Sequence, residues 1–550
     1  MSSFLASGSG EPKISISDVE SGERRLSEEN LLNDKEFSED IESPGFFDYL
    51  TSSTSSTKRK FGILPRLRHF IANLTLFLLP SFISSYFTTT TESSSSSSHT
   101  NEKLAPTAWL DGLRGLACAC VVIHHYFYEY FNQLEHPYDG INHVNWAQLP
   151  FLKLIHHGPP MVKIFFIISG FVLTVKAVKI TRATGTIDGH GLMNNLSSSV
   201  WKRYLRLYIP CAAGFVLCAV MISAGMMEAI PAGSKPKWIA GPLERRPPTK
   251  DNIFQQLMYA VKDFYIFAFD LTLFNIRDRK YSTDGHLWTI PIEFKSSIQL
   301  FIFVAGTCTL KRWLRVYIII PLTTIVLLYY GGWGLALFVF GYFLAELNSD
   351  IPTNNPKDRQ SRTSIFKLTF HTIMAITGLF LLSYPRKLPS SEYTTGFQFL
   401  VPLTPAKYPR AGGKRADSTH EFWQTIGSML LVWALLYLPR VQKVVLCNKI
   451  SQYFGKISFA IYIMHAQTQH SIGYWVVVNG LKLVGLWRYN VQKKVWDMVS
   501  GHNELYAAVV VGGFIFITFP TTVCWADVFW RGVDLQSVRF LRWLEPKIKR

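Results

Sequence analysis

Cysteine is scarce in this sequence and gives no sign of a disulfide framework. Six of the seven cysteines fall inside apolar blocks, and the seventh, Cys447, falls in a short basic loop. Oxidised extracellular domains usually carry paired cysteines in their loops, so this distribution argues against a disulfide-stapled secreted protein. A cleavable signal peptide is missing as well, because the first long apolar block begins only near residue 69.

Acidic residues are also few, with 38 Asp and Glu against 56 Lys and Arg, and the formal net charge is +18. Such an excess could indicate binding to nucleic acid. The basic residues, however, are spread over short loops between apolar blocks instead of forming one basic face, so we expect no nucleic acid partner. Their distribution fits the positive-inside rule and predicts that both termini are cytoplasmic.

Apolar residues make up 48% of the chain and are gathered into long blocks. Windows of about 19 residues predict roughly ten membrane spans. These spans lie near 110–131, 161–179, 205–226, 287–309, 314–330, 331–347, 366–384, 421–438, 453–479 and 505–530. The expected fold class is therefore all-α, a polytopic transmembrane helix bundle of about ten spans in a lipid bilayer. A further apolar stretch at 253–274 is broken by charged residues and predicts an interfacial or partly buried helix.

Composition divides the chain into three parts. Residues 1–104 are rich in Ser and acidic residues and predict disorder, with a candidate interfacial helix at 69–87 that is interrupted by Pro80. Residues 105–530 form the expected membrane domain, and 531–550 form a basic cytoplasmic tail. We expect no soluble domain after the last span, because only these twenty residues follow it.

Polar residues inside the predicted spans are the candidates for function. The stretch DGLRGLACACVVIHHYF begins at residue 111 and carries Arg114 and His125 eleven positions apart. Eleven positions are close to three helical turns, so both side chains share one face, about 16 Å apart along the axis. A neutral imidazole inside the bilayer can accept a proton from a hydroxyl group, which makes His125 a candidate general base. A core histidine bonded to a neighbouring helix explains His125 equally well.

The segment WKRYLRLYIP places Arg203 and Arg206 at positions i and i+3, at the inner end of the third span. Two guanidinium groups on one face form a cradle for the phosphates of a cytoplasmic ligand. Anchoring to anionic lipid is the simpler explanation for such a pair taken alone.

The segment HLWTIPIEFKSS brings His286, Trp288 and Glu293 into the fourth span. Glu293, about two turns in, is the costliest of them unless it is paired or hydrogen-bonded. A catalytic carboxylate and a purely structural pair with a Lys or Arg are both consistent with this pattern.

Two further motifs are weaker on their own. FFIISGF holds Ser169 beside Gly170 in the second span, and this pair of small residues favours close packing of two helices. ISFAIYIMH in the ninth span ends in His465.

Taken in order, these motifs resemble the acyltransferase 3 family of polytopic membrane enzymes, which includes bacterial O-antigen and Nod-factor O-acetyltransferases and fungal stand-alone members. The family's opening DGLRG and the histidine that follows it match Arg114 and His125. Its FFxxSGF segment, its Arg-x-x-Arg pair, its HLWxxxxE segment and its late S(Y/F)xxYxxH segment match 165–171, 203–206, 286–293 and 458–465. The likeness covers residues 105–530, and five motifs in one order are not expected by chance.

The resemblance implies that the protein moves an acyl group, most simply acetyl, from acyl-CoA to a hydroxyl of a small-molecule or carbohydrate acceptor. In this scheme His125 is the general base, Arg114 assists at the inner mouth, and Glu293 orients His125 or His286 by hydrogen bonding.

Binding roles follow from the same resemblance. Arg203 and Arg206 hold the phosphates of the coenzyme. The acceptor lies against polar and aromatic side chains of the other motifs, namely His286, Trp288, Ser169 and His465. Acyl-CoA serves as a co-substrate, and we expect no metal.

A transporter is the main alternative, because proton-coupled carriers also bury His, Glu and Arg along a path through the bilayer. The spans show no repeated halves and no matched pair of Gly- or Pro-broken helices, which argues against it. An inactive membrane scaffold of the same fold is disfavoured, because the catalytic and coenzyme-binding residues are all present. For the acceptor, a hydrophobic hydroxylated secondary metabolite suits the aromatic-rich spans, and a cell-surface sugar is the other choice.

Overall fold

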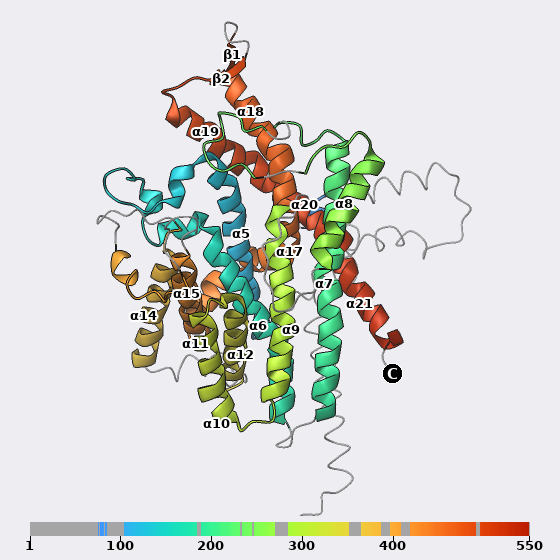
Figure 1. Cartoon of the computed structure of the whole chain (residues 1–550), viewed down its shortest axis with the longest axis vertical. Helices are drawn as coiled ribbons and strands as arrows, with labels where there is room; N and C mark the ends of the chain where they lie inside the picture. Colours follow the sequence, from blue (N-terminus) through green and yellow to red (C-terminus); the bar gives the residue numbers. More distant parts are fainter. Residues whose placement is uncertain are drawn as a thin grey trace, which may run out of the picture.

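A computed structural model describes residues 75, 77–81, 83–84, 104–183, 189–230, 234–244, 247–269, 284–350, 365–386, 396–408, 418–490 and 495–548. Nearly all regular structure in these ranges is helical (Figure 1). Their one sheet is an antiparallel hairpin of β1 (Trp487–Asn490) and β2 (Val495–Met498) at one end of the molecule. The predicted helical class is therefore confirmed. Of the region 1–104, which we expect to be disordered with an interfacial helix at 69–87, residues 1–74 and 85–103 lie outside the described ranges.

The bundle is built from helices that follow the predicted order along the chain. They are α5 (Ala108–Tyr130), α6 (Gly158–Ala183), α7 (Gly189–Ser223), α8 (Ile253–Ala268), α9 (Thr289–Thr307), α10 (Arg312–Leu314), α11 (Ile320–Tyr329), α12 (Trp333–Asn348), α14 (Ile365–Leu382), α15 (Thr419–Leu436), α16 (Pro439–Val441), α17 (Lys449–Thr468), α18 (Tyr474–Leu483), α19 (Asn503–Gly513), α20 (Phe519–Phe529) and α21 (Leu535–Ile548). The stretch predicted as an interfacial or partly buried helix at 253–274 forms α8, which buries one face.

Short helical turns link and interrupt these helices. The 3-10 turns are η2 (Asn132–Glu135), η3 (Trp146–Gln148), η4 (Leu152–His156), η5 (Gly285–Trp288) and η7 (Gln398–Leu400). The π turns are η6 (Arg315–Ile319), η8 (Gln442–Leu446), η9 (Gln469–Gly473), η10 (Phe514–Thr518) and η11 (Trp530–Asp534). A π turn is a widened segment of helix that often occurs at functional sites, and η9 directly follows the helix that carries His465.

Six helices in the described ranges are long and apolar enough to cross a membrane: Gly158–Arg182, Gly189–Ser223, Gly285–Thr307, Arg312–Tyr329, Ile365–Leu382 and Asn503–Ile548. A seventh span results if Thr419–Leu436 and Pro439–Leu446, which meet at 88°, are one broken span. The predicted count of ten is thus confirmed only in part. The segments predicted at 110–131, 331–347 and 453–479 are helical, but α12 has only 16 residues and α5 and α17 carry more polar side chains than a lipid-facing span tolerates.

Helix α5 stands between the two main hydrophobic cores. One face, which includes Leu113 and Val121, packs into a core with α6 and α12, and the other, which includes Val122 and Tyr126, packs into a core with α7, α9 and α17. Within the first core, Gly170 of α6 confirms the predicted close packing, because a Cβ there would lie 2.3 Å from the Phe338 carbonyl oxygen of α12. Polar side chains in the second half of α5, such as His124 and Glu129, are therefore buried between the two cores.

Helices α5 and α17 run parallel and touch through glycine. A Cβ added to Gly115 would lie 2.5 Å from the Gly455 nitrogen, so the two backbones are in direct contact. Along the same seam Arg114 donates to the Gly455 carbonyl oxygen at 2.9 Å, and the Cys118 thiol donates to the Ser458 carbonyl oxygen at 3.2 Å. His125 and His465 each lie ten residues beyond the contacting glycines. Parallel packing therefore places them at the same height in the bundle.

Candidate active site

Three imidazole rings meet where α5, η5 and α17 converge. The ring centroids of His125 and His286 are 4.3 Å apart, those of His286 and His465 are 4.7 Å apart, and those of His125 and His465 are 5.2 Å apart. His286 and His465 are buried, whereas the His125 side chain keeps 22% of its exposure. The fold thus brings together three predicted site residues and leaves one of them reachable. We call this group the histidine cluster.

Glu244 joins two of the three rings. Its Oε1 lies 2.7 Å from Nδ1 of His125, and its Oε2 contacts Nε2 of His286. Glu244 belongs to the connection between α7 and α8, which enters the bundle at this point. Burial opposes ionisation of Glu244, but the imidazoles of His286 and His125 outweigh burial and hold the pKa of this carboxyl well below its usual range. An ionised carboxylate only accepts, so Nδ1 of His125 carries the proton and Nε2 keeps its lone pair.

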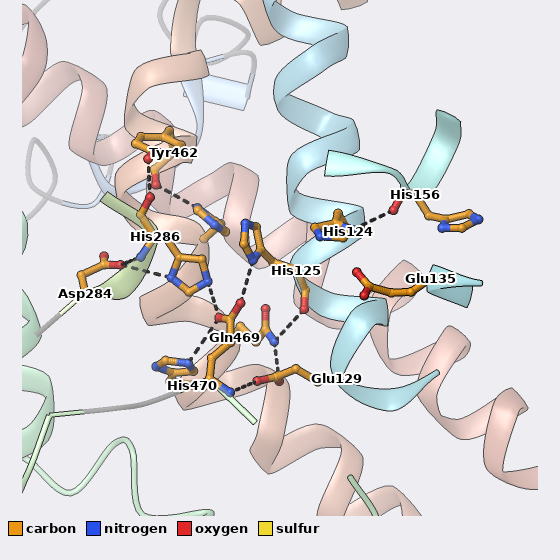
Figure 2. Close-up of polar contacts among 12 residues, drawn as sticks. His124, His125, Glu129, Glu135, His156, Asp284, His286, Tyr462, Gln469 and His470 are labelled. Carbon is orange, nitrogen blue, oxygen red and sulfur yellow. Dashed lines mark hydrogen bonds and ion pairs between the residues drawn. The ribbon is translucent and has the colours of Figure 1, made fainter. Parts of the chain in front are cut away.

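Glu129, fully buried one turn beyond His125, supports Glu244 from behind. One Glu129 oxygen accepts a hydrogen bond from the Glu244 backbone N–H at 2.7 Å, and the other accepts one from Nε2 of Gln469 at 2.6 Å (Figure 2). The Tyr474 hydroxyl lies 2.8 Å from both oxygens. Both oxygens of this buried carboxyl group therefore have hydrogen-bond partners, and one of these bonds holds the backbone of the segment that carries Glu244.

The other two rings are also held by their second nitrogen. Nδ1 of His286 lies 3.1 Å from Oδ1 of Asp284, and Nδ1 of His465 donates to the Tyr462 carbonyl oxygen at 2.8 Å. The Tyr462 hydroxyl in turn contacts the His286 carbonyl oxygen, as Figure 2 shows. Nε2 of His465 is buried and has no hydrogen-bond partner among the residues that the structure describes. That nitrogen is available to a ligand.

Glu293 belongs to a different polar group. Its carboxylate accepts the Ser169 hydroxyl at 2.8 Å and pairs with Arg203, whose Nε donates to Ser297 at 3.1 Å. In the described part of the chain the carboxylates that bond to the histidine cluster are Glu244 and Asp284, not Glu293. The reason is distance, because seven residues of helix place Glu293 about 10 Å along the axis from His286. The contacts correspond to the Glu–Arg pair that the sequence left open, and a catalytic role for Glu293 stays a prediction.

The remaining predicted residues lie around this core. Arg114 is at the far end of α5 from His125, where it pairs with Asp111 at 3.0 Å and bonds to α17. Arg206 lies one turn beyond Arg203 on α7, and Trp288 at the end of η5 is 43% exposed. Their proposed contacts with substrate stay predictions.

Sequence reasoning missed Glu244 and Glu129. Glu129 carried a usable sign, because it lies inside a predicted span just as Glu293 does. Glu244 carried none, because a carboxylate in a loop with basic neighbours is ordinary in a sequence, and only the fold turns this one inward.

A family model described as an acyltransferase domain matches residues 107–529. The chain belongs to the acyltransferase 3 family. Over 480 residues it is 27% identical to O-acetyltransferase PaAT-1 of Phomopsis amygdali, covering 82% of this chain and 87% of that protein. It is 24% identical to acyltransferase clz18 of Cochliobolus lunatus over 474 residues, covering 78% of this chain and 93% of the relative. No solved structure matches the chain.

Membership in the acyltransferase 3 family makes the protein a membrane O-acyltransferase. Three separate family motifs, those that hold His125, His286 and His465, meet in the histidine cluster. Motifs that are each weak in the sequence are therefore parts of one site in the fold.

An open cavity of about 740 Å³ lies near the cluster of this acyltransferase 3 chain, between the segment after α7, helix α18 and the hairpin. Trp238, Trp475, Trp487 and Trp496 line it. The Trp238 ring lies 6.1 Å from the ring of Tyr474, which donates to Glu129. Direct contacts thus connect the wall of this cavity to Glu129 and, through it, to Glu244 beside the histidine cluster.

Proposed function

We propose that the protein transfers an acyl group, most simply acetyl, from acyl-CoA to a hydroxyl of an acceptor, and that His125 is the general base. The observation that carries the proposal is the hydrogen bond between Glu244 and Nδ1 of His125. It fixes the tautomer in which Nε2 can accept a proton, and it stabilises the imidazolium that forms.

In the proposed reaction the acceptor oxygen attacks the thioester carbon while Nε2 of His125 takes its proton. The tetrahedral intermediate collapses, the carbon–sulfur bond breaks, and the thiolate of the coenzyme takes the proton from His125. The products are the ester and free coenzyme A, and the base returns to its neutral form. A positioned base of this kind contributes about 10²–10⁴-fold, roughly 3–5 kcal/mol.

For the donor, we assign the coenzyme phosphates to Arg203 and Arg206 on α7. Contacts with Glu293 and Ser297 hold the guanidinium of Arg203 in one orientation and leave it other N–H donors for a phosphate. Arg114 and Glu293 then act on the donor side of the site, and His286, Ser169, Trp288 and His465 line the path of the reactants.

For the acceptor, we propose a hydroxylated secondary metabolite, with a carbohydrate as the other class. The tryptophan-lined cavity supports either, because indole faces stack on flat apolar rings and on the C–H faces of sugars. We also propose a topology of about ten spans with cytoplasmic termini, in which α5, α12, α15 and α17 complete the bundle inside a shell of apolar helices.

The test is transfer of radiolabelled acetyl from acetyl-CoA by the detergent-purified protein to a panel of hydroxylated metabolites and sugars. His125→Gln should lower the rate by at least about 100-fold, in line with loss of a general base. The matched control is His124→Gln, because His124 is the adjacent residue but points to the His156 carbonyl oxygen, away from His125 (Figure 2). Equal activity of the two variants would contradict the role of His125.

A second variant tests the donor site. Arg203→Ala should mainly raise the KM for acetyl-CoA, and Glu293→Gln, which keeps the guanidinium but removes its charged partner, shows how much of that change comes from loss of the ion pair. A KM for acetyl-CoA that neither variant changes would remove α7 from the donor site.

A further inference from the structure

We propose that His125, His286 and His465 form a binding site for a divalent cation of the zinc class, and that a bound cation blocks acyl transfer by taking the lone pair of the base. Cation binding stands on the geometry alone. Only the blocking of transfer rests on the proposed function.

The distances suit such a cation. One ring nitrogen from each of the three histidines can be chosen so that all three lie within 4.8 Å of one another. In a tetrahedral zinc site with Zn–N bonds of about 2.0–2.1 Å, ligand nitrogens lie about 3.4 Å apart. Ring movements of about 1 Å would therefore close the site, which is within the reach of side-chain rotation.

The supporting contacts are those of metal-binding histidines. In such sites the second ring nitrogen usually donates to a carboxylate or a backbone carbonyl, which fixes the ring. Here Nδ1 of His286 contacts Asp284, Nδ1 of His465 contacts the Tyr462 carbonyl oxygen, and Nδ1 of His125 contacts Glu244. The buried Nε2 of His465, for which the described residues provide no hydrogen-bond partner, is a second and independent observation that points to a ligand.

The charges also balance. A buried dication needs compensating negative charge, and Glu244 and Asp284 both contact the cluster. Without a cation, His286 lies between these two carboxylates as an imidazolium would. Binding then replaces one proton by the cation: the proton leaves His286 for solvent, a metal–nitrogen bond forms, and the freed Glu244 oxygen becomes available as a fourth ligand. Imidazole with carboxylate is a ligand set that zinc and its neighbours accept.

A cation on His125 stops the proposed reaction. Because Glu244 holds Nδ1 of His125, the cation binds Nε2, and the lone pair that would accept the hydroxyl proton is then bonded to the metal. From the sequence we expect no metal, and no local motif with metal-ligand spacing contains these three histidines. It is the convergence of three chain segments that creates the ligand set.

The binding test uses purified full-length protein carrying an affinity tag without histidine, titrated with Co²⁺. We expect one Co²⁺ per chain, with the visible absorption of tetrahedral cobalt, and displacement by Zn²⁺. His465→Gln should weaken binding by more than about 100-fold, because a direct ligand matters at least as much as outer-shell partners do. His124→Gln should leave binding unchanged. Absence of tetrahedral Co²⁺ in the parent, or equal binding by His465→Gln, would overturn the site.

A neighbouring group makes a further comparison necessary. Glu129, Glu244 and His470 also approach within the same reach of one another. His470→Gln should retain the cobalt spectrum. If His470→Gln loses the spectrum and His465→Gln keeps it, the cation is bound by Glu129, Glu244 and His470, and the proposed site is wrong.

A second experiment measures the rate of acyl transfer as a function of Zn²⁺ concentration. The rate of each variant is normalised to its own rate without metal. Zn²⁺ should inhibit the parent reversibly, with recovery after chelation, and His465→Gln should need at least about tenfold more Zn²⁺ for half inhibition. Bound cation with an unchanged rate would overturn the blocking step. If no acceptor is ever acylated but Co²⁺ still binds as described, the proposed function fails while the cation site stands.

Discussion

Glu244 is the residue that orients two of the three clustered histidines. Its carboxylate contacts His125 and His286 at once, and its backbone N–H is held by Glu129. The Glu244 carboxylate keeps 19% of its side-chain exposure and His125 keeps 22%, so neither side chain is fully enclosed. His125 is therefore held in one orientation by Glu244 and is still partly exposed.

Replacing Glu244 by Gln tests this arrangement. The amide keeps the size of the side chain but cannot stabilise an imidazolium as a carboxylate does, so kcat for acetyl transfer should fall by about 10²-fold or more while KM for acetyl-CoA changes little. The pH profile should shift as well, because the charged partner of His125 is gone. Asp251→Asn, an exposed carboxylate in the same connection between α7 and α8 and away from the cavity, is the control. Equal kcat for both variants would contradict the role of Glu244.

At the residue scale the sequence singles out the three histidines more readily than the groups that bond to them. His125, His286 and His465 could be chosen because a polar residue in an apolar run stands out. Glu244 could not, since its burial depends on how the connection after α7 folds back, and no local pattern encodes that. Glu293 was rightly singled out as a carboxylate that must be paired, but its partner is Arg203.

At the scale of elements, the parallel contact between α5 and α17 sets the geometry of the site. Glycine at 115 and 455 lets the backbones touch, and the histidines ten residues further along inherit that alignment. The sequence predicted both helices and the small-residue packing at Gly170. It could not predict which helices pair, because apolar spans of similar length pack against many neighbours equally well.

Gly455→Ala should destabilise the protein markedly. A Cβ at this position would lie 2.3 Å from the Asp111 carbonyl oxygen, so the two helices must separate. The control is Gly306→Ala near the end of α9, where a Cβ meets nothing within 4 Å and should be neutral or stabilising by up to about 1 kcal/mol. Thermal unfolding of detergent-solubilised protein measures both, and a Tm for Gly455→Ala at or above the parent's would contradict the close contact.

At the scale of the whole molecule, a buried ion pair near the C-terminal end of the described chain forms hydrogen bonds to a segment near its N-terminal end. Asp527 and Arg531 pair at 2.9 Å and are almost fully buried. Asp527 also accepts the Ser81 backbone N–H at 2.8 Å and the Tyr453 hydroxyl at 3.1 Å, and Arg531 donates to the Leu79 carbonyl oxygen at 2.6 Å. The segment around Pro80, predicted as interfacial, is thereby attached to the bundle.

Asp527→Asn should therefore lower the free energy of unfolding by about 3–5 kcal/mol, the usual effect of leaving a buried charge without its partner. Asp497→Asn provides the comparison, because Asp497 pairs with the exposed Lys237 on the surface and should change stability by no more than about 1 kcal/mol. Chemical denaturation in one detergent measures both, and equal losses would show that the buried pair does not hold the ends together.

The π turn η9 gives the helix that begins at α17 one residue more than a regular α-helix would have there. Deleting a single codon within Gln469–Gly473 could restore the regular helix, and every residue beyond it would rotate by about 100° about the axis. Tyr474 and Trp475, and with them one wall of the tryptophan-lined cavity, would turn away from their present neighbours. One deletion at this point would therefore reshape the tryptophan-lined cavity and remove the bond from Tyr474 to Glu129, although His465 before it keeps its place in α17.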